Sequence, residues 1–206
     1  MKKFTVNALR RAAMKAFSKK EVQAQLYNIV HEKFVEKKSK LINDFENHPV
    51  SKEIKNGETA SNSSGTLIGG NGNLFSFLGF FQGTDPVGEV SNYLEKNVKM
   101  MKRPEISIKG NATYYEFEIR YPDKEELKSV SPMEWETGRS WLFGIEKGVS
   151  GLSHYLYHKY YPPHVSNSTT AIQSKYRVIK KEGVTFKRTS YISLMLSNFK
   201  KGWGRL

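Results

Sequence analysis

The stretch SKKEVQAQLYNIVHEKFVEKKSKLINDFE (residues 18–46) has the pattern of one long amphipathic helix. Apolar residues recur along it at steps of three and four, at Leu26, Ile29, Val30, Phe34, Leu41, Ile42 and Phe45. Ser18 and Glu21 form an S-x-x-E capping box at its start, and His48-Pro49 follows its end. The pattern predicts a helix over about residues 19–46, which is long enough to act as a lever or as a surface for another subunit.

The positive charge of the chain lies at its two ends. The 206 residues carry a formal charge of +13. Residues 1–20 hold seven Lys or Arg and no acidic residue, residues 175–206 hold nine against Glu182, and the centre is nearly neutral. A surplus of this kind limits non-specific partners to anionic ones, such as nucleic acid, lipid headgroups or acidic proteins. We expect residues 1–18 to form a basic arm and residues 19–206 a single α+β domain.

Between the ends, the sequence predicts a Gly-rich flexible loop and several short elements. Residues 56–82 are rich in Gly, Ser, Asn and Thr and contain the apolar run LFSFLGFF at 74–81. The periodicity predicts a helix over 89–101 and paired strands over 106–121. Residues 131–163 contain four glycines, and we expect a loop or a hairpin there that leads to a short aromatic helix near 150–160. A second hairpin over 175–188 and a terminal helix over 190–199 complete the expected fold. The expected architecture is therefore a long N-terminal helix packed with a small antiparallel sheet and a C-terminal helix.

The motifs that would indicate catalysis are incomplete. Gly65–Gly70 has the spacing of a phosphate loop but is followed by Asn71-Gly72 in place of Lys-Ser/Thr. Ser150 lies in GVSGL, which misses the G-x-S-x-G pattern at its last position. His154 and His158 share a helical face without an acidic residue between them. The chain has no cysteine, which excludes disulfides, thiol catalysis and Cys-ligated zinc. We expect no enzymatic activity, no cofactor and no bound metal; a hydrolase using Ser150 or the carboxylate of Glu116 is the catalytic alternative.

Two longer segments carry a resemblance. ASNSSGTLIGGNGNLFSFLGFFQGTDPV (60–87) and SPMEWETGRSWLFGIEKGVSGLSHYL (131–156) are similar to the neck proteins of tailed bacteriophages, the head–tail joining and tail-completion class. The resemblance implies a virion protein, assembled in the host cytoplasm, that forms a six- or twelve-fold ring with itself. Portal or connector proteins and tail proteins would be its partners, DNA would pass through its channel, and no membrane would be involved.

The ring implied by this resemblance needs two different surfaces on each subunit. We expect the first from an insertable loop that carries Leu74, Phe75, Phe77, Leu78, Phe80 and Phe81. Further aromatic interface candidates are Trp135, Trp141 and Tyr155. The basic arm would make contacts through Lys2, Lys3, Arg10, Arg11, Lys15, Lys19 and Lys20. The alternative function is a basic nucleic-acid-binding protein that uses the two ends against phosphate.

Overall fold

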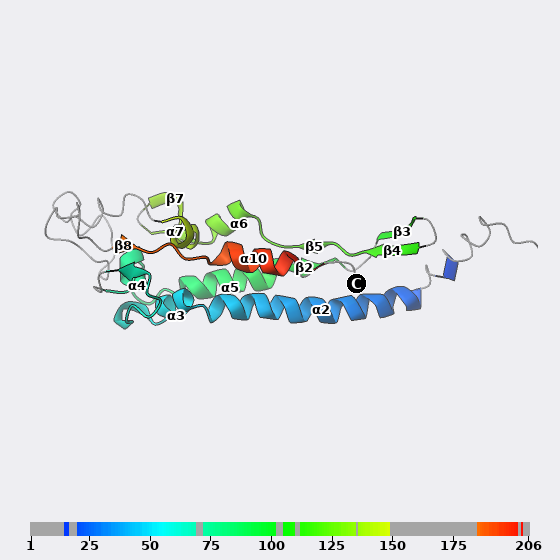
Figure 1. The fold of residues 1–206 in the computed structure, drawn as a ribbon, viewed down its shortest axis with the longest axis horizontal. Helices are drawn as coiled ribbons and strands as arrows, with labels where there is room; N and C mark the ends of the chain where they lie inside the picture. Colours follow the sequence, from blue (N-terminus) through cyan, green and yellow to red (C-terminus); the bar gives the residue numbers. More distant parts are fainter. Residues whose placement is uncertain are drawn as a thin grey trace, which may run out of the picture. The chain divides into compact units, whose positions relative to one another are not determined.

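The computed structural model describes residues 15–16, 20–68, 72–101, 105–109, 112–134, 136–148, 185–201 and 203 (Figure 1). It has the mixed α+β class expected from the sequence, with a long N-terminal helix, small antiparallel sheets and a C-terminal helix. Its contacts divide the chain into two compact units. Unit 1 comprises residues 1–39 and 97–121, and unit 2 comprises residues 40–96 and 122–206. The expected division into a basic arm, residues 1–18, and one domain, residues 19–206, stays a prediction.

The long helix α2 spans Lys20–Glu46, close to the predicted 19–46. Val30, Phe34, Leu41 and Phe45 are buried at helical spacing, as the periodicity predicts. After α2 the chain turns into α3 (Pro49–Lys55), which begins with a proline at its first position. The Nδ1 atom of His48 accepts the Val50 backbone N–H at 3.3 Å and so caps this helix. None of the helices in the described ranges has the length and apolar character needed to cross a membrane.

Unit 1 contains two pairs of antiparallel strands. Strand β2 (Lys99–Met100) pairs with β5 (Ile119–Arg120), and β3 (Glu105–Lys109) pairs with β4 (Ala112–Glu116). The predicted alternation is observed: Tyr115, Phe117 and Ile119 are half-buried, whereas the residues between them are exposed. Strands therefore occupy the predicted region 106–121, although they form two separate pairs.

The core of unit 2 is surrounded by short helices and strands. They are η1 (Gly57–Thr59), β1 (Leu67–Ile68), α4 (Leu74–Leu78), α5 (Pro86–Asn97), α6 (Lys124–Ser129), β6 (Pro132–Met133), β7 (Glu136–Ser140), α7 (Trp141–Lys147), β8 (Thr185–Phe186) and α10 (Ile192–Lys201). Strands β1 and β8 pair antiparallel, as do β6 and β7. The helix expected over 89–101 begins earlier, because Asp85 accepts the Gly88 backbone N–H at 2.8 Å and caps α5. It also ends earlier, at Asn97, because Lys99 and Met100 pair with β5 as strand β2. The loop or hairpin expected after residue 131 is a hairpin of β6 and β7, followed by α7, and the terminal helix is present. The short helix expected near 150–160 and most of the hairpin expected over 175–188 lie outside the described residues.

Tyr191 lies at the centre of the core of unit 2. Its ring lies 5.4 Å from that of Phe45, 4.8 Å from that of His48 and 6.4 Å from that of Trp141, measured between centroids. Its hydroxyl group bonds to the hydroxyl group of Ser51, which also donates to the Phe45 carbonyl. Burial raises the pKa of the Tyr191 phenol far above its ordinary value. One side chain from the C-terminal segment thus connects the end of α2, α3 and α7.

Candidate functional site

The run at 74–81, expected as an exposed docking loop, is instead part of the core. Residues 74–78 form α4, whose start is capped by the Asn73 side chain accepting the Ser76 N–H at 2.9 Å. Gly79 adopts φ +74°, the left-handed conformation that ends the helix. Leu74, Phe75, Phe77, Leu78 and Phe80 are buried within the single chain, and Phe81 is half-buried. This corrects the expectation, because burial against the same chain removes these apolar side chains from water without a partner.

A buried carboxylate fixes the segment that leads into α4. Glu53 accepts the Ser64 N–H on Oε2 at 2.7 Å and the Leu74 N–H on Oε1 at 2.8 Å. Its side chain is fully buried on α3. The described parts of the expected loop at 56–82 therefore contain η1, β1 and α4. Two backbone N–H groups of this region donate to the carboxylate of Glu53.

The other predicted site residues fall into two groups. Trp141 is 1% exposed and packs in the core, which corrects its expected role as an interface residue. Lys15 and Lys20 are exposed, as contacts of a basic arm would have to be. The remaining candidates lie outside the described residues: Trp135, Tyr155, Lys2, Lys3, Arg10, Arg11, Lys19, Ser150, His154 and His158.

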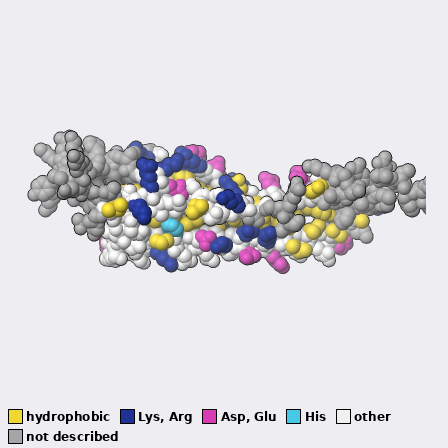
Figure 2. Space-filling view, viewed as in Figure 1, with side chains coloured by type: hydrophobic (Ala, Val, Ile, Leu, Met, Phe, Trp, Pro, Cys, Tyr) yellow, Lys and Arg dark blue, Asp and Glu magenta, His cyan; other side chains and the backbone are white. Residues whose placement is uncertain are grey.

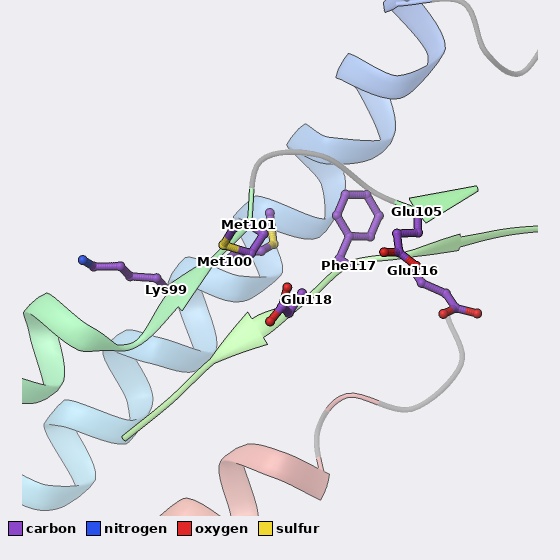
Figure 3. Close-up of a pocket in the computed structure, with 7 residues that line it drawn as sticks. All are labelled: Lys99, Met100, Met101, Glu105, Glu116, Phe117 and Glu118. Atoms are coloured by element: carbon purple, nitrogen blue, oxygen red, sulfur yellow. The ribbon is translucent and has the colours of Figure 1, made fainter. Parts of the chain in front are cut away.

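The candidate site lies in unit 1, in a pocket of about 740 Å³ beside strands β2 to β5 (Figure 3). Its apolar part is formed by Met100, Met101 and Phe117, which gather in the middle of the view. Its acidic part is formed by Glu105, Glu116 and Glu118, all of which are exposed. The Met101 backbone N–H donates to the Glu118 carbonyl at 2.9 Å, which fixes the two sides of the pocket to each other.

Two carboxylates of this pocket lie opposite each other, where their negative charges repel. Glu105 and Glu116 are direct partners in the antiparallel register of β3 and β4. Residues directly opposite in such a pair project on the same face, where like charges destabilise the pair. Lys99 also lines the pocket, but in Figure 3 its side chain points away from the three carboxylates. The arrangement suits a cationic ligand that also has an apolar surface.

The sequence contains a partial signal for this pocket. The period-2 spacing of Glu116 and Glu118 indicates a solvent or partner face of a strand. The opposition of Glu105 to Glu116 depends on strand register, which the spacing alone does not give. Within the described ranges, no three His, Cys, Asp or Glu side chains are grouped so that they could hold a metal ion.

Comparisons of the chain with protein-family models, with curated proteins and with solved structures found no match in any of the three.

Proposed function

We propose that the protein is a non-catalytic structural subunit of a tailed-phage neck, which joins the portal side of the head to the tail within a six- or twelve-fold ring. The resemblance of residues 60–87 and 131–156 supports this class. Phe80 from the first segment lies edge-on to Trp141 from the second, with ring centroids 5.8 Å apart. The two motifs thus share one core, as expected of a signature that maintains a fold.

The acidic pocket of unit 1 supports a mechanism of assembly in which one copy binds the next. Its occupant in this proposal is residues 1–17 of the basic arm of a second copy. This arm holds five Lys or Arg, no acidic residue, and apolar residues at helical spacing such as Leu9, Ala13 and Phe17. Its cations would relieve the repulsion between Glu105 and Glu116, and its apolar face would cover Met101, which is 51% exposed. Such a contact joins different patches on successive copies, which is the geometry that closes rings.

The substitution Glu116→Gln tests this mechanism without weakening the fold. It removes one of two opposed carboxylates, so the hairpin should gain about 0.2–1 kcal/mol of stability. The same change should weaken self-association of the full chain at low ionic strength, measured by sedimentation velocity. Glu32→Gln, at an exposed position of α2, makes the same charge change outside the pocket and should leave association unaltered.

Two further measurements separate the parts of the proposal. Deletion of residues 1–17 should abolish the same association, and a peptide of residues 1–17 should bind the deleted chain more tightly than its Glu116→Gln variant. Equal association of the Glu116→Gln and Glu32→Gln chains would contradict the role of the pocket. The neck assignment is tested by antibody labelling of tailed particles from the natural source, which should mark the junction of head and tail; labelling elsewhere on the particle would contradict it.

A further inference from the structure

A second pocket, of about 230 Å³ in unit 2, is lined by four cationic side chains. Lys124 and Lys128 lie four residues apart on α6, Arg139 lies on β7, and Lys147 is the last residue of α7. None of the described residues that line this pocket is acidic. Figure 2 shows Lys and Arg side chains gathered over the part of the surface formed by α6 and α7.

A fifth cation lies at the edge of this pocket. Gly148, which ends α7 with φ +90°, belongs to the lining. A Cβ atom built on Gly148 would lie 3.2 Å from Nε of Arg188. The absence of a side chain at this position therefore leaves the Arg188 guanidinium next to the pocket formed by the four other cations.

The segment that supplies the pocket, residues 123–148, also carries acidic side chains. Several of them make contacts that keep them out of the pocket. Asp123 and Glu126 form the capping box of α6. Glu146 accepts the backbone N–H groups of Tyr191 at 3.2 Å and Ser193 at 2.7 Å, together with the Ser193 hydroxyl at 2.6 Å. Glu125 is paired with a pocket cation, at 2.7 Å from Lys128.

The cations of the pocket act on one another. The charge of Lys147 is the largest cause that lowers the pKa of Lys124, and the charge of Lys128 adds to it. Positive charges that line one pocket repel one another, and a bound anion would offset this repulsion. A single carboxylate carries one negative charge, whereas a phosphate group carries up to two and has three oxygens that accept several charge-assisted hydrogen bonds.

We propose that the pocket of Lys124, Lys128, Arg139 and Lys147 binds a phosphate group. The arginine supplies a fork that matches two phosphate oxygens, and the lysines supply compact charges around it. The pocket is open to solvent, so the group can belong to a free phosphate compound or to the backbone of a nucleic acid. This site is separate in residues and in ligand charge from the acidic pocket of unit 1.

Calorimetric titration of the full chain at low ionic strength with pyrophosphate, a single-stranded oligonucleotide and a poly-glutamate peptide tests the proposal. Lys124→Gln/Lys147→Gln should reduce the affinity for pyrophosphate at least about tenfold, the effect of one charge-assisted hydrogen bond. Lys52→Gln/Lys55→Gln, at exposed positions of α3, makes the same change in net charge and should leave the affinity within about twofold. Thermal melting should show that both variants fold, since the first also relieves repulsion.

The titrations also distinguish the two sources of the phosphate group. Displacement of the oligonucleotide by pyrophosphate would support the site and assign it to backbone phosphates; binding of pyrophosphate alone would support the site and assign it to free phosphate compounds. Pyrophosphate should also slow acylation of Lys124, followed by mass spectrometry, without slowing acylation of Lys55. Equal losses in the two double variants, no binding of either phosphate ligand, or tighter binding of poly-glutamate would each overturn the proposal.

Discussion

Replacing Phe80 with alanine tests whether the run at 74–81 is core or docking surface. The Phe80 ring is 1% exposed and lies 5.5 Å from the ring of Phe75 and 5.8 Å from that of Trp141. Loss of its burial removes about 1.5–3 kcal/mol of transfer free energy. The cavity left between the two rings adds to this, so the total expected for a buried phenylalanine is about 3–5 kcal/mol.

The matched control is Phe81→Ala, because the two residues are neighbours of the same type and Phe81 is only half-buried. Its expected cost is within about 1 kcal/mol. In a chain of this size each kcal/mol lowers the melting temperature by about 2–4 °C, so Phe80→Ala should melt about 6–20 °C below the wild type and Phe81→Ala within about 4 °C of it.

Thermal melting followed by circular dichroism, with urea unfolding as a second measurement, separates the two interpretations. An exposed docking loop predicts that both variants melt like the wild type and that a chain lacking residues 74–81 remains folded. Burial in the core predicts that this deletion prevents unit 2 from folding. A melting temperature for Phe80→Ala within about 2 °C of the wild type would refute the packing argument.

Three further predictions concern other buried groups of unit 2. Because the pKa of Tyr191 is raised by burial, the unfolded chain loses this phenolic proton first, and stability should fall above about pH 10 by up to about 1.4 kcal/mol per pH unit; Tyr191→Phe should flatten this fall in alkaline urea titrations. Burial lowers the pKa of His48, so the unfolded chain binds a proton more readily and stability should decline as the pH falls below about 6.5; His48→Asn keeps a cap acceptor and should remove the decline, whereas an unchanged acid profile would exclude His48 as its source. Glu53→Gln leaves one of the two backbone N–H groups facing an amide NH2 and should cost about 1–3 kcal/mol in urea unfolding, while Glu95→Gln on the exposed face of α5 should cost little.

Local patterns in the sequence predict the long helix, the paired strands and the terminal helix. Helix α2 follows from apolar spacing, and the exposed and half-buried residues of β4 follow from alternation, because both depend only on neighbours a few residues away. The sequence allows a loop or a hairpin over 132–140, and it does not predict helix α7, which follows the hairpin. Its start depends on Ser140, whose side chain accepts the Phe143 N–H and bonds to the hydroxyl of Ser131.

The interpretation of residues 74–81 shows where the sequence is ambiguous. A short apolar run after a Gly-rich segment is compatible with a docking loop and with a buried helix. The choice depends on Glu53, whose hydrogen-bond partners lie 11 and 21 residues further along the chain. The basic pocket of unit 2 is hidden in the sequence for a similar reason. Acidic residues lie close to its Lys and Arg residues along the chain, and only the tertiary structure places the cations in the pocket and these acids outside its lining.

The position of Tyr191 also has a consequence for the order of events during synthesis. Tyr191, whose ring joins Phe45, His48 and Trp141, leaves the ribosome after all three of them, and strand β8, the partner of β1, precedes it by only a few residues. A nascent chain can form α2 early from local contacts, but the core of unit 2 stays incomplete until Tyr191 has been added. Messages truncated before the codon for Tyr191 should therefore yield chains that proteases degrade, so incomplete copies would be removed before they could associate with complete ones.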